Sequence, residues 1–283
     1  MTRPKFCRLA LSVIVSGLMI GQASATTITQ WNFENDTIAV NNSPAPSTGV
    51  GTASSIGMTN SYNSTTSVTA DDVIAGANGD TGGNGASDLT QVWRIRGQSP
   101  GNGWSSQAPI GTQGAVFAAS TVGYSAINVS FDWYLTNQAP TNMMLEYSNN
   151  GGTTWVDQAI NIGSDTPISS LMGNALDANT VNGPYVQASP AGQGQEWLQG
   201  LTATINDPLA ANNPNFEFEL VNASTGADVL GAKGGAYNNN SGNWRFDNIT
   251  ISGTAVPVPE PSSVALLLIG AAGLVTCIRR NRS

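Results

Sequence analysis

The stretch Asn128-Val-Ser-Phe-Asp-Trp-Tyr-Leu135 carries the pattern that decides the fold. Apolar and polar side chains alternate along it, and the apolar set consists of Val129, Phe131, Trp133 and Leu135. A period of two residues is typical of a strand that buries one face and exposes the other. The stretch therefore predicts a strand of an antiparallel sheet.

The same alternation recurs in Asn215-Phe-Glu-Phe-Glu-Leu220, where Glu217 and Glu219 are expected on the solvent face. Further strands are predicted over 143–147, 155–160 and 244–251. The turn-rich segments 41–57 and 78–87 are expected to form surface loops. No convincing amphipathic helix occurs between residues 26 and 253, so the sequence predicts an all-β, antiparallel sandwich spanning 26–254.

The charges are distributed unevenly along the chain. Of the 10 basic residues, six lie close to the two ends, whereas the segment between them holds 17 of the 18 acidic residues. A segment this acidic repels phosphate backbones and attracts divalent cations instead. We therefore do not expect the chain to bind nucleic acid.

Histidine and cysteine usage narrows the chemistry further. The chain has no histidine, which excludes Ser-His-Asp and Cys-His catalysis and removes the commonest zinc ligand. Its two cysteines, Cys7 and Cys277, lie in the apolar terminal segments, so the middle segment has no disulfide to stabilise it.

Residues 1–25 have the three parts of a secretory signal peptide. A basic front is followed by the apolar run 9–20 and by small residues, Ala23 and Ala25, that suit cleavage before Thr26. The alternative, a first transmembrane helix, needs a longer apolar run.

Residues 255–283 have a different three-part order. Pro259, Glu260 and Pro261 precede an uncharged span over about 262–278, which is just long enough to cross a bilayer as a single helix. A basic tail over 279–283 then follows, with Arg279, Arg280 and Arg282. Basic clusters of this kind hold a helix end on the cytoplasmic side.

The order and spacing of these C-terminal elements closely resemble the PEP-CTERM sorting signal. In that family the membrane span is transient. The transpeptidase exosortase recognises the Pro-Glu-Pro motif, removes the tail and passes the protein to the cell surface or extracellular matrix. Its hosts are typically Gram-negative bacteria that build exopolysaccharide. The resemblance thus implies export, transient insertion in the inner membrane, exosortase as a partner and exopolysaccharide as a second candidate partner.

Two weaker resemblances concern the middle segment. The run 148–155 resembles a single Asp-box, with Asn150 where aspartate is usual, and we interpret it as a structural hairpin turn. The order of the strands resembles jelly-roll sandwiches of concanavalin-like, MAM-like and carbohydrate-binding modules. In those folds the first and last strands pair, and an acidic residue near each often binds calcium. The resemblance implies Glu34 and Asp247 as calcium ligands, the alternative being two solvated edge acids.

Two features bear on activity. Glu217 and Glu219 lie roughly 7 Å apart by strand rise, a distance that suits a glycosidase, but their setting favours a solvated strand face over catalysis. Trp104, in a Gly-Asn-Gly-Trp loop, is a candidate glycan contact, with packing as the alternative. We therefore expect no catalytic residues and a non-enzymatic structural or adhesive role, ahead of a carbohydrate-binding module and an extracellular glycoside hydrolase.

Overall fold

The computed structural model describes residues 24–34, 36–37, 39–58, 72–75, 91–96, 103–136, 138–161, 185–187, 197–229, 231 and 242–256. This part of the chain is built of strands, with two short 3-10 turns and no α-helix. The strands are β1 (Ala25–Trp31), β2 (Thr52–Ile56), β3 (Asp72–Ala75), β4 (Gln91–Arg96), β5 (Gly114–Ala118), β6 (Tyr124–Leu135), β7 (Asn142–Ser148), β8 (Val156–Gln158), β9 (Tyr185–Gln187), β10 (Trp197–Thr204), β11 (Glu217–Asn222) and β12 (Asn243–Ala255). The 3-10 turns are η2 (Pro208–Ala210) and η3 (Gly226–Asp228).

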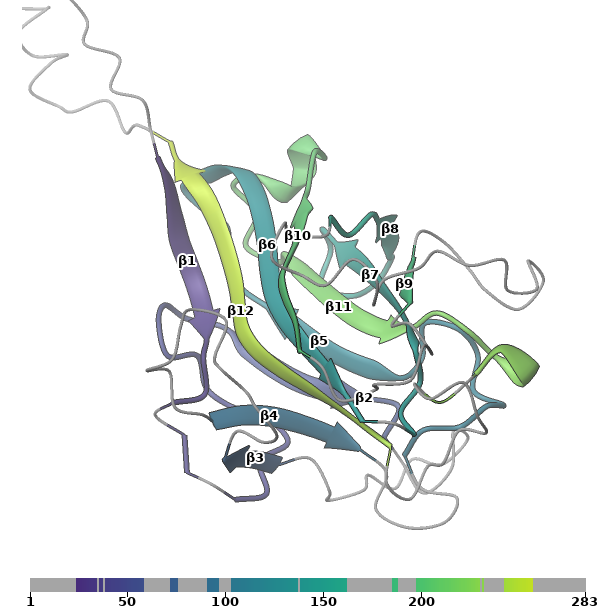
Figure 1. Ribbon diagram of the computed structural model, residues 1–283. Coiled ribbons are helices and arrows are strands. Elements are labelled where there is room, and N and C mark those ends of the chain that lie inside the picture. The colour runs from purple at the N-terminus through teal and green to yellow at the C-terminus, as the bar shows by residue number, and fades with distance from the viewer. Residues whose placement is uncertain are drawn as a thin grey trace, which may run out of the picture.

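The strands form two antiparallel sheets that pack face to face (Figure 1). Sheet A has the order β10-β6-β12-β4-β3, and β1 also pairs with β12. Sheet B has the order β2-β5-β11-β7-β8, and β9 also pairs with β7. The predicted all-β, antiparallel two-sheet architecture is confirmed.

The alternating pattern of β6 buries the face that the sequence predicts. Val129, Phe131, Trp133 and Leu135 are each at most 2 % exposed and face sheet B. β12 also turns its apolar residues inward, but their spacing changes along the strand. Trp244 and Phe246 are followed by Ile249 and Ile251, because the register against β6 shifts between Asp247 and Thr250 and Asn248 adopts a φ of 51°. This bulge keeps both halves of the strand facing the core.

Aromatic rings join the two sheets. Phe117 of β5 lies 5.3 Å from Trp31, 5.9 Å from Trp93 and 6.2 Å from Phe246 in sheet A, measured between ring centroids. It also stacks at 5.2 Å on Phe218 of its own sheet. All five rings are fully buried, so Phe117 is a central packing element between the layers.

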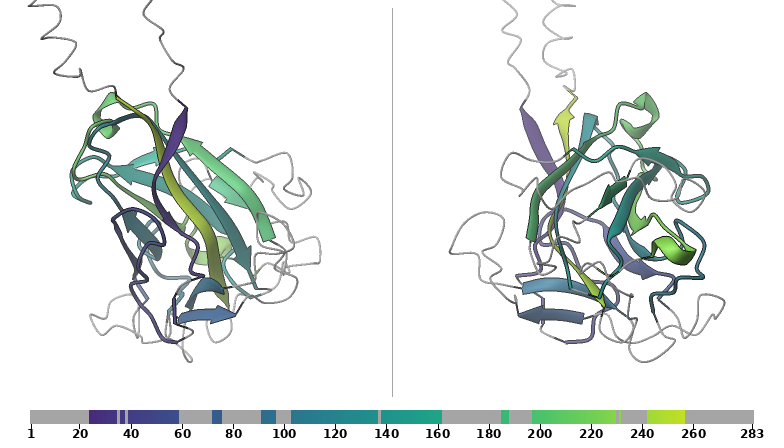
Figure 2. Two further views of the ribbon diagram at one scale, coloured as in Figure 1. Left: turned by 90° about the vertical axis from the view of Figure 1, so that its left-hand side faces the viewer. Right: turned by 45° about the vertical axis from the view of Figure 1, so that its right-hand side comes forward.

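The first described strand, β1, lies along the C-terminal half of the last strand, β12. β1 pairs antiparallel with β12 from Ala25 opposite Thr254 to Trp31 opposite Ile249. The start of β1 and the end of β12 therefore lie together at one end of the sandwich (Figure 2). This pairing of terminal strands agrees with the expectation from jelly-roll modules.

The segment 41–57 departs from its prediction as a surface loop. Its last residues form β2, an edge strand that pairs with β5 from Thr52 opposite Ala118 to Ile56 opposite Gly114. The small polar side chains of β2 give no hydrophobic alternation, since only Ala53 is buried. Its pairing depends on backbone hydrogen bonds to β5, which the composition of one strand does not reveal.

The terminal segments of the chain, 1–23 and 257–283, lie outside the described residues. The signal peptide except for its last two residues, the span at 262–278 and the basic tail therefore stay predictions. No helix in the described ranges is long and apolar enough to cross a membrane.

Candidate functional site

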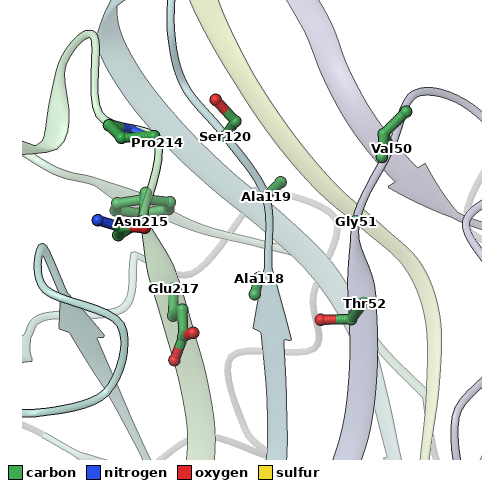
Figure 3. A pocket seen from close by; sticks show the side chains of 10 residues that line it. Val50, Gly51, Thr52, Ala118, Ala119, Ser120, Pro214, Asn215 and Glu217 are labelled. Carbon is green, nitrogen blue, oxygen red and sulfur yellow. The ribbon is translucent and has the colours of Figure 1, made fainter.

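The outer face of sheet B carries a shallow hollow of about 290 Å³. Its floor is set by the register of three neighbouring strands, because Thr52 of β2 and Glu217 of β11 both pair with Ala118 of β5. The two polar side chains therefore flank a methyl group across two strand spacings, roughly 9–10 Å. Figure 3 shows Thr52 and Glu217 on either side of Ala118.

The rim of the hollow combines polar and apolar groups. Asn215 and Ser120 continue the polar edge, and Val50, which is 86 % exposed, and Pro214 supply apolar surface. The side chains of Thr52, Asn215 and Glu217 form no hydrogen bond with any other residue that the structure describes. Their donors and acceptors are therefore available to a ligand.

Gly51 lets the chain pass close beneath this rim. A Cβ atom built there would lie 2.6 Å from the Ala118 carbonyl oxygen and 2.8 Å from Cζ2 of Trp31. No real side chain fits at that distance. Gly51 thus holds β2 close to β5, and this proximity fixes the spacing of Thr52 from Glu217.

A row of carboxyl groups lies next to the hollow on the same face. Glu219 of β11 pairs with Glu146 of β7, which in turn pairs with Asp157 of β8. Side-chain hydrogen bonds join Glu219 to Glu146 and Glu146 to Asp157. Two adjacent carboxyls can share a hydrogen bond only when one of them is protonated.

Glu219 keeps its proton to a higher pH than Glu146 does. Burial raises the pKa of Glu219 to about 8, and the neighbouring charges of Glu146 and Glu217 act in the same direction. Burial also raises the pKa of Glu146 to about 7, although the hydrogen bond from Glu219 opposes this shift. Glu219 therefore donates to Glu146, which donates to Asp157 in its own protonated form. Burial raises the pKa of Glu217 as well.

The prediction that Glu217 and Glu219 lie on one outward strand face is correct, but the prediction that this face is solvated is wrong for Glu219. Glu219 is 4 % exposed, whereas Glu217 is partly exposed. Glu146 occupies the neighbouring position on β7, and Gly111, in the loop before β5, lies close to the Glu146 carboxylate. The pattern of β11 alone could not reveal these neighbours.

Glu146 and Asp157 were not singled out from the sequence. Glu146 lies in β7, which is almost entirely buried, and Asp157 lies in β8, which has only three residues. Neither strand shows a clear alternation, and only the register between strands brings the two acids to Glu219. The signal that could have found them is the repetition of an acid at the outward position of three predicted strands.

The prediction of Trp104 as a glycan contact is wrong. Trp104 is fully buried, and its ring packs on Trp244 with centroids 4.5 Å apart. Glycine neighbours suggested an exposed loop, but burial of a large ring in the core is more favourable than exposure. The strand patterns also predict Trp133, Trp155 and Trp244 as core residues; Trp133 and Trp244 are fully buried, whereas Trp155 is only partly buried.

Glu34 and Asp247, the two acids expected to bind calcium, lie at the paired terminal strands. Glu34 follows the end of β1 by three residues, and Asp247 is part of β12. The Glu34 carboxylate accepts a hydrogen bond of 3.1 Å from the Gln91 backbone N–H. Asp247 is 2 % exposed, and its carboxylate accepts from the Asn248 backbone and amide side chain. The same Asn248 amide donates to Asp132 of β6, an acid that the sequence did not single out. Among the described residues, no group of three or more acidic, histidine or cysteine side chains could hold a metal ion.

The Asp-box turn has the structure expected for a hairpin. Asn150 accepts at Oδ1 from the Thr154 backbone and the Ser148 hydroxyl, and Gly152 has a φ of 73°. The turn also packs beside the hollow, because a Cβ on Gly152 would lie 3.1 Å from Glu217 Oε2. Its residues thus shape the site from one side.

The remaining candidate residues lie at or beyond the edge of the described part. Pro259, Glu260, Pro261, Arg279, Arg280, Arg282 and Ala23 are outside it. Ala25 is the first residue of β1 and is exposed, so the predicted cleavage position lies at the start of the sandwich.

Comparisons with known proteins bear mainly on the C-terminal segment. Residues 257–281 match the PEP-CTERM protein-sorting motif. The match supports the sorting signal predicted from the sequence, and with it export and sorting at the cell envelope. It covers only this end of the chain. No curated protein sequence matches the chain.

Two solved structures are similar to the chain at low identity. One contains the CBM22-1 and GH10 modules of the Clostridium thermocellum xylanase Xyn10B, with 14 % identity, a TM-score of 0.29 and 66 % of this chain covered. The other is an exo-beta-agarase, with 14 % identity, a TM-score of 0.34 and 83 % of this chain covered. The match covers 26 % of each of those chains.

Proposed function

We propose that the chain is an exported cell-surface or extracellular-matrix protein whose β-sandwich has a non-enzymatic, structural or adhesive role. The observation that carries this proposal is the sorting motif at 257–281, which begins two residues after β12 ends at Ala255. The sandwich is thus joined almost directly to its sorting signal. Exosortase is the partner that the signal implies.

The pairing of β1 with β12 supports this arrangement. Ala25, at the predicted cleavage position, lies opposite Thr254, near the start of the sorting segment. The start of β1 and the end of β12, to which the export signal and the sorting signal are joined in the sequence, therefore lie at the same end of the sandwich (Figure 2).

The arrangement of the carboxyl groups supports a non-enzymatic role. Glu146 and Glu219 lie on adjacent strands and bond to each other, whereas a glycosidase pair stands on two sides of the bound sugar. A panel of glycoside substrates tests the hydrolase alternative. Carbohydrate binding is the second candidate function, and the hollow around Ala118 favours it.

Changing Pro259, Glu260 and Pro261 to alanine is expected to leave export intact and to abolish surface delivery almost completely. The protein should stay in the membrane with its apolar span and basic tail, because such a span is retained unless it is removed. Fractionation followed by intact-mass measurement checks this. A matched control replaces Pro44 and Pro46, a second Pro-x-Pro run in a loop, and should be delivered normally. Delivery of the motif variant at wild-type mass would contradict the sorting proposal.

Calcium binding at Glu34 and Asp247 stays a prediction. At a hundredfold excess over its dissociation constant, calcium should stabilise the native state by about 2.7 kcal/mol and raise the melting temperature by roughly 5–10 °C. The Asp247→Ala variant should lose this shift, whereas Asp157→Ala, in the other sheet, should keep it. A melting temperature of the metal-stripped wild type that millimolar calcium leaves unchanged would show that these acids are not ligands.

A further inference from the structure

We infer that the hollow formed by Thr52, Ala118 and Glu217 binds one pyranose unit of a polysaccharide that carries no carboxyl groups. The inference rests on the proposed adhesive role and gives it a ligand class. It follows from three features of the described residues: the spacing of the polar groups, their free hydrogen-bonding capacity and the charge around them.

The spacing suits a sugar ring. Register places Thr52 and Glu217 on opposite sides of the Ala118 methyl group, roughly 9–10 Å apart between strands. The hollow of about 290 Å³ is close to the lower limit for a small-molecule site. It is open on the solvent side, which suits one unit within a longer chain.

The polar groups suit hydroxyls. The Glu217 carboxylate only accepts, the Thr52 hydroxyl donates and accepts, and the Asn215 amide does both. None of these side chains is bonded to another described residue, so each can bond a sugar hydroxyl without first breaking a contact. The Ala118 methyl and the Pro214 ring can cover the apolar C–H face of the ring.

The surrounding charge excludes acidic sugars. Glu217 lies in the hollow itself and Asp157 lies farther along the same sheet, whereas Glu146 and Glu219, between them, carry no charge while they are protonated. The segment between the terminal signals has 17 acidic residues and four basic ones. A uronic acid would place its carboxylate against this negative field, whereas a neutral sugar would not.

Ligand-observed saturation-transfer NMR on the full-length chain in mild detergent tests the inference. The neutral probes are cellohexaose, mannohexaose and chitohexaose, and the acidic probe is an oligogalacturonate of similar length. At least one neutral probe should bind with a dissociation constant on the order of 1 mM, and the oligogalacturonate should not bind.

Variants locate the site. Ala118→Leu fills the hollow from an outward position and should abolish transfer, and Glu217→Gln should weaken binding roughly tenfold. Asp157→Asn removes a charge from the same face outside the hollow and should bind as wild type does. Thermal melting confirms that each variant is folded.

The inference is overturned if no neutral probe binds, if the oligogalacturonate binds equally well, or if folded Ala118→Leu binds as wild type does. Such a failure would leave the sorting proposal intact, because delivery of the wild-type protein is measured separately. If delivery fails while sugar binding is unchanged, the sorting proposal is contradicted and the inference about the hollow stands.

Discussion

Replacing Phe117 by alanine is expected to lower the free energy of unfolding by about 4 kcal/mol, the largest effect of any single substitution considered for this chain. The ring contacts four other aromatic rings, three of them in the opposite sheet, and all are fully buried. Its removal leaves a cavity between the layers that rigid neighbouring rings cannot refill. For a domain of this size the melting temperature should fall by roughly 8–16 °C.

Thermal and denaturant unfolding measure this effect. The matched control is Val50→Ala, which truncates an 86 % exposed side chain and should change the unfolding free energy by less than about 0.5 kcal/mol. A loss of under about 1 kcal/mol for Phe117→Ala would mean that this ring does not join the two sheets as described.

The second large effect is on the pH dependence of stability, and it concerns Glu219. Because burial raises the pKa of Glu219 and of Glu146 to about 8 and about 7, the folded protein binds more protons than the unfolded chain above pH 4.5. The contribution of these two carboxyl groups to the free energy of unfolding is therefore fully present below their pKa values in the unfolded chain. It is lost as the pH rises to about 8. The melting temperature should drop by roughly 5 °C or more between pH 5 and pH 9.

The Glu219→Gln variant should lose most of this drop. A neutral amide can donate to Glu146 as the protonated acid does, and it cannot ionise at high pH. The variant should match the wild type near pH 5 and exceed its melting temperature at pH 9. Glu34→Gln changes an acid that follows β1 of sheet A, away from the carboxyl row of sheet B. In calcium-free buffer its melting temperature should depend on pH as that of the wild type does. A wild-type melting temperature that rises between pH 5 and pH 9 would contradict the protonated carboxyl row.

The sequence was most informative where one strand carries its own alternation. β6 buries the predicted face, and the paired terminal strands agree with the order of the motifs. β2 and β5 were not predicted, because their small residues give no alternation and their pairing depends on neighbouring strands.

The candidate site was less predictable for the same reason. The position of Glu217 opposite Ala118 and Thr52, and of Glu219 opposite Glu146, depends on register between strands far apart in the chain. Trp104 shows the converse, since local glycines predicted exposure and long-range packing on Trp244 buries it. Local composition cannot determine contacts of this kind.

The most direct test of sorting by exosortase is the intact mass of the wild-type protein recovered from the cell surface. We expect a chain that begins at Thr26 and has lost its basic tail, with Arg279, Arg280 and Arg282 removed. A surface protein that retains the sequence through Ser283 would contradict sorting by tail removal.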